Sequence, residues 1–193
     1  IFGGLEAWDA LVCTSSSGRE VANRTIDFFH ESFERKYNIK IPKKKRPKLH
    51  TIPLAVNDIT YDKELTRKEK RLKARKRIGI PENAVVILFL GRLSFHGKAH
   101  PLALYKSISK ISSEIDNKKI ILLECGTFAN KEIEELYNNL ICSQTHLTVK
   151  RVGGLRQATE QEKIDSLNAA NIFISLADNI QETFGLTVIE AMD

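Results

Sequence analysis

The chain has 193 residues and a formal net charge of +6, and 42% of its residues are hydrophobic, which is enough for a folded core. Its longest apolar run, Ala84 to Leu90, is far too short to span a bilayer. The three cysteines, Cys13, Cys125 and Cys142, have neither metal-ligand spacing nor an even-numbered disulfide framework. The composition therefore favours a cytoplasmic protein with free thiols over a membrane-spanning or disulfide-rich one.

The first 57 residues predict a short α/β segment. A buried strand over residues 9–14 precedes a turn at 15–18 and a helix that runs to about Tyr37. Residues 49–56 include a second short strand. The basic run before that strand, residues 43–48, is expected to form a solvated loop.

A linker is expected from residue 58 to 63, with a helix after it. Thr66 is the predicted cap, Glu69 follows three residues later in a capping-box spacing, and Gly79 is the C-terminal stop. This helix carries a second basic run, residues 67–77, which we expect to be its outer face. Such runs can bind anionic lipid or nucleic acid, so peripheral contact with an anionic membrane at its inner face stays open as an alternative. No nucleic acid is expected, because the sequence offers charge without an aromatic stacking pattern.

From residue 84 onward, strands and helices alternate strictly. Residues 84–90 are unbroken in their apolar character, which predicts a central parallel strand ending at Gly91. The later predicted elements are helices at 102–114, 130–142 and 161–170 and strands at 119–125, 147–152 and 172–176. The alternation predicts a doubly wound, Rossmann-like parallel sheet whose ligands bind at the carboxyl ends of the strands. Neither a dinucleotide fingerprint nor a Walker sequence occurs, so a dehydrogenase or P-loop enzyme is not supported.

The end of the chain predicts a phosphate-binding turn. A helix should begin near Gly185, with Thr183 as a candidate cap. Leu186, Val188 and Ile189 are expected to form its buried face. The first amides of a helix point outward without partners, and a glycine there lets a ligand approach the backbone. That combination suits a phosphate group.

Two carboxylates, Glu182 and Glu190, bracket this turn in an E-x7-E spacing. On a continuous helix they would lie roughly 12 Å apart along the axis, too far for a glycosidase acid/base pair. They better suit opposite parts of one elongated ligand, and carboxylates accept hydrogen bonds from pairs of hydroxyls, as in a sugar nucleotide. The alternative is that Glu190 is a solvated helix residue and Glu182 an ordinary loop acid.

The loop after the first strand of this region offers positive charge. Residues 91–98 contain Arg92 and Lys98, whose guanidinium and ammonium groups could share the charge of a diphosphate leaving group. The alternative is that both are solvated cations. His96 and His100 flank the lysine, and neither is assigned as a ligand or base.

The stretch from Glu182 to Met192, Glu-Thr-Phe-Gly-Leu-Thr-Val-Ile-Glu-Ala-Met, resembles the donor-site motif of retaining glycosyltransferases of glycosyltransferase family 4, which have the GT-B fold. Gly-Arg-Leu at residues 91–93, followed by Lys98, resembles a second motif of that family. Residues 52–57, Ile-Pro-Leu-Ala-Val-Asn, are similar to its Ile-Pro-x-Gly-Val-Asp but have alanine for glycine and asparagine for aspartate.

The resemblance implies a division of roles within the site. Glu182 would meet the donor sugar, Glu190 the nucleotide ribose, and the backbone of residues 184–187 the diphosphate. The implied catalytic residues are Arg92, Lys98 and Glu182. The implied donor- and nucleotide-binding residues are Gly91, Arg92, Lys98, Phe184, Gly185, Leu186, Thr187 and Glu190.

No metal and no other cofactor is expected, because the nucleotide diphosphate sugar is a co-substrate and the side chains supply the positive charge. No protein general base is assigned, since in the family's usual account the departing phosphate takes the acceptor proton. Cys125-Gly126 and Gly153-Gly154 are interpreted as close-approach turns, and the family binds the nucleotide base near the latter.

The resemblance divides the chain into the C-terminal part of an acceptor-side domain (1–57), a linker and helix (58–83), and an incomplete donor-binding domain (84–193). We expect a fragment, inactive alone, of an enzyme that moves a sugar from a nucleotide diphosphate sugar to a hydroxyl of a glycan, lipid-linked or small-molecule acceptor, with retention of configuration. The alternatives are a non-catalytic nucleotide-sugar-binding module and a basic nucleic-acid-binding protein.

Overall fold

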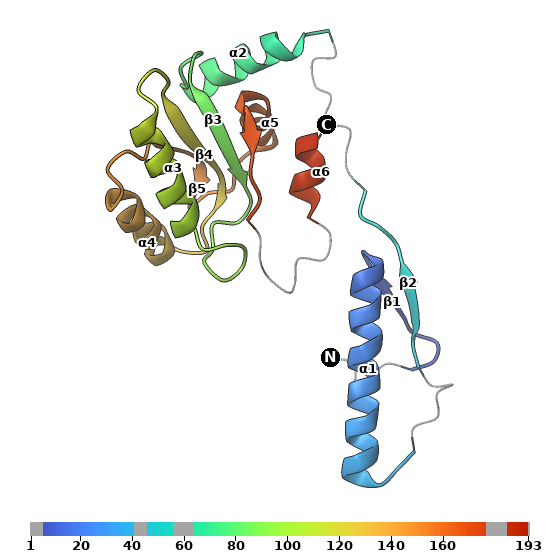
Figure 1. Cartoon of the computed structure of the whole chain (residues 1–193). Coiled ribbons are helices and arrows are strands. Elements are labelled where there is room, and N and C mark those ends of the chain that lie inside the picture. Colours follow the sequence, from blue (N-terminus) through green and yellow to red (C-terminus); the bar gives the residue numbers. More distant parts are fainter. Residues whose placement is uncertain (1–5, 41–45, 56–63, 177–184, 193) are drawn as a thin grey trace. The chain divides into compact units, whose positions relative to one another are not determined.

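The computed structural model describes residues 6–40, 46–55, 64–176 and 185–192. They belong to two compact units, one holding residues 6–40, 46–55, 185 and 186 and the other residues 64–176 and 187–192 (Figure 1). In chain order the elements are β1 (Ala10–Cys13), α1 (Ser16–Tyr37), β2 (Lys48–Thr51), α2 (Arg67–Ile78), β3 (Val85–Leu90), α3 (Leu102–Glu114), β4 (Ile120–Thr127), α4 (Lys131–Cys142), β5 (Val149–Gly154), α5 (Glu160–Ala169), β6 (Ile172–Phe173) and α6 (Leu186–Met192).

The first unit is a single βαβ motif. Strands β1 and β2 pair in parallel, with Ala10 opposite Lys48, and α1 connects them. The helix begins where the Ser15 side chain accepts a hydrogen bond from the amide of Gly18, and it ends at Asn38, whose φ of 52° is left-handed. The helix predicted for this segment is confirmed, and so is a strand, but the strand is not buried as predicted, because Val12 is 60% exposed and Leu11 and Cys13 are only partly buried.

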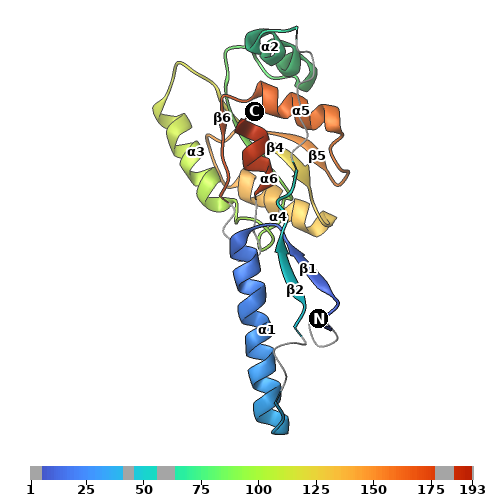
Figure 2. The same cartoon turned by 90° about the vertical axis from the view of Figure 1, so that its right-hand side faces the viewer.

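The second unit is a four-stranded parallel sheet in the order β5-β4-β3-β6. Helices α3 and α4 cover one face and α2 and α5 the other (Figures 1 and 2). Strand β4 shows the two-sided burial directly, because Ile120 and Leu122 pack under α3 and α4 while Ile121 and Leu123 pack under α2 and α5. The predicted doubly wound, Rossmann-like sheet with a central β3 is confirmed.

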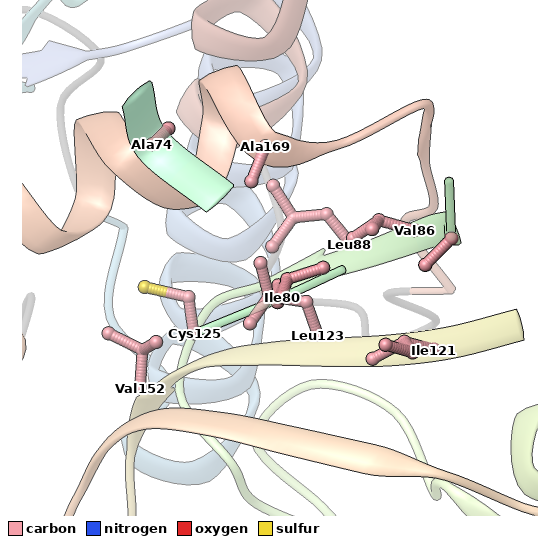
Figure 3. Packing of buried hydrophobic residues seen from close by; sticks show 10 residues of the cluster. Ala74, Ile80, Val86, Leu88, Ile121, Leu123, Cys125, Val152 and Ala169 are labelled. Atoms are coloured by element: carbon pink, nitrogen blue, oxygen red, sulfur yellow. The ribbon is translucent and has the colours of Figure 1, made fainter. Parts of the chain in front are cut away.

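The core beneath α2 and α5 depends on small residues in the helices. Ala74 of α2 and Ala169 of α5 are fully buried over Val86 and Leu88 of β3 (Figure 3). Because alanine has only a methyl side chain, both helices can lie close to the sheet. Cys125 belongs to the same cluster, and burial raises the pKa of its thiol, as expected of a core cysteine rather than a reactive one.

The ends of α2 confirm the capping signals in the sequence. The amide of Glu69 donates to the Thr66 hydroxyl, and the Glu69 carboxylate accepts from the Thr66 amide at 2.7 Å, which is a complete capping box. Gly79 closes the helix with a φ of 76°, and its amide donates to Arg75 O at 2.8 Å.

The expectation that the basic run lies on the outer face of α2 is wrong for Arg75. This residue is only 2% exposed. Its guanidinium donates to the carbonyls of Ala169 and Ala84 at 3.0–3.1 Å and to Asn171 Oδ1 at 2.6 Å. Burial, with a smaller contribution from Arg71, lowers the pKa of Arg75. The planar guanidinium donates to carbonyl oxygens from three segments of the chain, so this buried cation holds the three segments together.

The last helix also differs from its predicted packing. Val188 and Ile189 are 40% and 38% exposed, so they do not form a buried face. Leu186 and Glu190 are partly buried instead, one turn apart on the same side of α6. The predicted strand at 172–176 is shorter as well, because β6 covers Ile172 and Phe173 alone, with one further bond from the Ile174 amide to Leu88 O at 2.9 Å.

Of the helices that the structure describes, none has the length and apolar character needed to cross a membrane.

Candidate functional site

The carboxyl ends of β3, β4 and β5 are held unusually close by three glycines. A Cβ atom on Gly126 would lie 1.8 Å from the carbonyl oxygen of Gly91, and one on Gly153 would lie 2.3 Å from that of Gly126. The Gly91 amide donates to Cys125 O at 3.0 Å, which fixes the first two strand ends in register. The predicted close approach is confirmed and is between neighbouring backbones, but Gly126 and Gly153 lie within β4 and β5 and not in turns.

The loop after β3 presents the two predicted cations differently. Leu93 is fully buried, and its amide donates to Thr127 O at 3.0 Å, so the loop is anchored just after Arg92. Arg92 itself is exposed. Lys98 is half-buried and folds back to the strand end. A Cβ atom added to Gly91 would lie 3.9 Å from the Cε atom of Lys98. The loop therefore holds the lysine at the end of β3 and leaves the arginine free to reach into solvent.

This loop lies at the reversal point of the sheet. Strands β4 and β5 extend the sheet on one side of β3, whereas β6 lies on the other side. In doubly wound sheets the connections diverge at such a point and leave a crevice at the carboxyl ends of the strands, where ligands bind. Gly91, Arg92 and Lys98 follow one of the two strands that border this crevice.

Glu190 of α6 makes an ion pair that the sequence did not predict. Lys163 Nζ of α5 lies 2.7 Å from Glu190 Oε1, and the two side chains are only 24% and 14% exposed. The interpretation of Glu190 as a solvated helix residue is therefore wrong. No local pattern could have indicated the pair, because its members are 27 residues apart.

Glu190 also lines an open cavity of about 270 Å³. The cavity is bordered on the α2 side by Arg67, Lys70 and Arg71, and the buried Nε atom of Arg71 has no hydrogen-bond partner among the residues that the structure describes. Its floor includes Leu88 and Phe173. Ala170 and Asn171, which directly precede β6, also line the cavity, so it lies towards the amino ends of β3 and β6 and is not lined by the β3 loop.

Part of the predicted site lies outside the described residues. This holds for Glu182 and Phe184, as well as for the candidate cap Thr183. Gly185 has a φ of 63°, the left-handed conformation that glycine tolerates, and Leu186 and Thr187 begin α6. The roles of residues 182–187 stay predictions.

A second buried polar cluster lies on the face covered by α3 and α4. Glu124 of β4 is 2% exposed, Arg151 of β5 donates to its Oε2 from Nε and Nη2 at 3.1 and 2.9 Å, and the Tyr105 hydroxyl donates to its Oε1. Burial, followed by Glu124, raises the pKa of Tyr105. The sequence feature that could have indicated this cluster is the single carboxylate of Glu124 within an otherwise apolar strand. The group cross-links β4, β5 and α3, and its charges compensate each other.

His100, just after the loop of residues 91–98, has structural contacts, and His96 is exposed. His100 Nδ1 accepts the amide of Leu102 at 3.3 Å, and its ring centroid lies 5.0 Å from that of Phe95. Among the residues with described positions, no three His, Cys, Asp or Glu side chains come together as a metal site. The expectation of metal-free chemistry stays a prediction.

The parallel sheet, its strand order and its strand-end loops define a Rossmann-like α/β protein. Residues 70–193 match the family described as Glycosyl transferases group 1. The chain belongs to this family. No curated protein sequence is similar enough to the chain to count as a relative.

Several solved structures share the fold. A UDP-forming α,α-trehalose-phosphate synthase from Burkholderia xenovorans aligns with a TM-score of 0.53 and 9% identity over 95% of this chain. The N-terminal domain of Candida albicans trehalose-6-phosphate phosphatase aligns with a TM-score of 0.52 and 12% identity over 91%. Sucrose-phosphate synthase from Thermosynechococcus elongatus aligns with a TM-score of 0.50 and 18% identity over 95%. The chain spans 43%, 40% and 38% of these three structures, respectively.

Proposed function

We propose that the protein is part of a retaining glycosyltransferase of family 4 that moves a sugar from a nucleotide diphosphate sugar to an acceptor hydroxyl. The observation that carries the proposal is the cationic loop, with Lys98 folded against Gly91 at the reversal point of a glycosyl transferases group 1 sheet. An anionic diphosphate is the part of a sugar nucleotide that such a loop would bind.

In this mechanism the bond between the anomeric carbon and the diphosphate oxygen breaks, and negative charge develops on the leaving group. Arg92 and Lys98 compensate that charge. Lys98 is already held at the strand end, whereas the exposed Arg92 closes onto the phosphates when the donor binds. The acceptor oxygen bonds to the anomeric carbon on the same face, and its proton passes to the departing phosphate. The products are a glycoside of unchanged configuration and a nucleoside diphosphate.

The carboxylates bind the two ends of the donor. Glu182 meets the sugar, and Glu190 accepts hydrogen bonds from the ribose hydroxyls. The position of Glu190 supports its role, since the carboxylate is partly buried and held by Lys163. A hydroxyl that donates to a carboxylate in such surroundings forms a charge-assisted bond.

Candidate donors can be ordered from the structural comparisons. One neighbour is named as a UDP-forming synthase and another as a sucrose-phosphate synthase. Uridine diphosphate sugars are therefore the first donors to test, followed by those of guanosine and adenosine diphosphate. The acceptor is a glycan, a lipid-linked sugar or a small molecule with a free hydroxyl.

A ligand screen followed by product analysis tests the proposal. Thermal unfolding of the full-length protein is measured with each nucleoside diphosphate and its sugar, and the donor that raises the unfolding temperature is then incubated with acceptors. We expect one base to be preferred, and we expect proton NMR to show that the product keeps the anomeric configuration of the donor. Binding without transfer or hydrolysis would instead identify a non-catalytic module, and an inverted product would exclude a retaining enzyme.

A further inference from the structure

The ion pair between Lys163 and Glu190 joins two helices that lie on the same face of the sheet. Lys163 is in the first turns of α5, just after the cap at Thr159, and Glu190 is near the end of α6. The 2.7 Å separation and the limited exposure of both side chains distinguish this contact from the exposed ion pairs on α1 and α4. An ion pair shielded from solvent holds its geometry more firmly than an exposed one.

The lysine engages only part of the carboxylate. Lys163 Nζ bonds to Glu190 Oε1, and a carboxylate offers roughly four acceptor positions on its two oxygens. Among the described residues Glu190 makes no second side-chain hydrogen bond, so the remaining positions can accept from a ligand. A glutamate without such a partner would have to give up side-chain rotamer freedom when a ligand arrives, which weakens binding.

We propose that Lys163 is a positioning residue for nucleotide recognition: it fixes the Glu190 carboxylate so that its unoccupied acceptor positions meet the ribose hydroxyls of the donor. This inference rests on the proposed function, because it assigns Glu190 to the ribose. It adds a residue from α5 to a site otherwise built from the β3 loop and α6. Lys163 does not touch the reacting atoms, so its effect appears in binding of the ribose and not in the chemical step.

Nucleotides with and without ribose hydroxyls separate this role from a structural one. Isothermal titration calorimetry on the full-length protein uses uridine, guanosine and adenosine diphosphates and their 2′,3′-dideoxy forms. For the preferred base, we expect the parent protein to bind the ribose form about tenfold or more tightly than the dideoxy form, because a charge-assisted bond is lost in the latter. Lys163→Met should bring that ratio close to one and leave dideoxy binding unchanged.

Two further variants calibrate the result. Lys163→Arg keeps the positive charge and should restore part of the preference for ribose. Lys131→Met removes an exposed cation whose ion pair with Glu135 lies on α4, on the opposite face of the sheet, and should leave both affinities at parental values. Thermal unfolding of each variant reports whether α6 stays docked.

The outcomes are distinguishable. A parental ribose preference in Lys163→Met would overturn the inference while leaving the proposed function intact. Equal weakening of ribose and dideoxy forms, together with a lower unfolding temperature, would show a purely structural pair and would also overturn it. A parent protein that binds no nucleoside diphosphate would refute the proposed function and the inference together.

Discussion

Arg75 shows how a single buried cation can be satisfied without a carboxylate. Its guanidinium contacts carbonyl oxygens from α5 and from the segment before β3, together with the side chain of Asn171. Asn171 Oδ1 in turn accepts the amide of Val86 at 2.9 Å. One side chain thus joins α2 to the start of β3 and to the turn before β6.

Replacing Arg75 by methionine should lower the free energy of unfolding by roughly 3 kcal/mol, because it leaves several buried acceptors without donors. Lys76→Met, at the adjacent exposed position, is the matched control and should change stability little. Urea denaturation of the two variants measures the difference. Similar midpoints for both would contradict the structural role of Arg75.

The two site glutamates should have separable effects. Glu190→Gln should chiefly weaken nucleotide binding, since it removes the charge that faces the ribose, whereas Glu182→Gln should chiefly slow transfer through the sugar. Steady-state kinetics with donor, combined with nucleoside diphosphate titrations, measures both. Equal losses of affinity and turnover in the two variants would remove the division of roles.

Residue-level prediction from sequence succeeded where the signal was local and failed where it was not. Thr66, Glu69 and Gly79 form a pattern readable within one helix, and the structure confirms all three. Arg75 contacts residues as many as 96 positions away, and Lys163 bonds to a residue 27 positions away. No helical or strand periodicity encodes such contacts, so they became visible only in the folded chain.

At the scale of elements, α5 begins with a capping box reinforced by an arginine. Glu162 accepts the amide of Thr159 at 2.8 Å and bonds to Arg156 Nη1 at 2.7 Å. The hydrogen bond from Arg156, followed by that from the Thr159 backbone, lowers the pKa of Glu162 from 4.5 to about 2. The same helix carries Lys163, so this cap also supports the proposed nucleotide site.

This pKa predicts a pH dependence of stability. The lowered value means that the contribution of Glu162 is fully present above pH 4.5 and is lost as the pH falls towards 2, because the unfolded chain takes up the proton first. Glu162→Gln should therefore be less stable than the parent at pH 7 and should lose less stability between pH 5 and pH 2.5. Thermal unfolding at several pH values measures this. A mutant curve parallel to that of the parent would contradict it, and Arg156→Met should flatten the curve similarly.

Because β3 and β4 approach closely at their carboxyl ends, a side chain added at Gly126 should clash with the neighbouring strand. A methyl group there would meet the backbone of Gly91, which cannot move aside as a flexible side chain would. Gly126→Ala should cost about 1–3 kcal/mol of stability by overpacking and should weaken nucleoside diphosphate binding, because the displaced backbone leads directly into Arg92. Denaturation and titration calorimetry measure the two effects. Parental values in both would show that the strand ends tolerate separation.

The limits of an element were predicted most closely where clear stop signals bound it. Strand β3 and helix α3 lie within one residue of their predicted limits because each is a long run bounded by glycine, proline or a charge. Helix α6 begins at Leu186, next to its predicted start at Gly185, but its packing was wrongly predicted, and strand β6 is shorter than predicted. Their hydrophobic residues suggested burial, but burial depends on covering elements that the local sequence does not specify.

At the scale of the whole molecule, a βαβ unit and a four-stranded Rossmann-like sheet each form around parallel strands. Membership of the glycosyl transferases group 1 family rests on residues 70–193, which include both the β3 loop and α6. We propose that this part of the chain binds the diphosphate of a sugar nucleotide through its cationic loop, residues 91–98.

Titration calorimetry of the full-length protein with its preferred nucleoside diphosphate, and with the same nucleoside lacking phosphates, tests that claim most directly. Arg92→Ala and Lys98→Ala should each weaken diphosphate binding by about tenfold or more, because each removes a charge-assisted contact. Both variants should bind the unphosphorylated nucleoside as the parent does. Unchanged diphosphate affinity in the two variants would contradict the assignment of the loop.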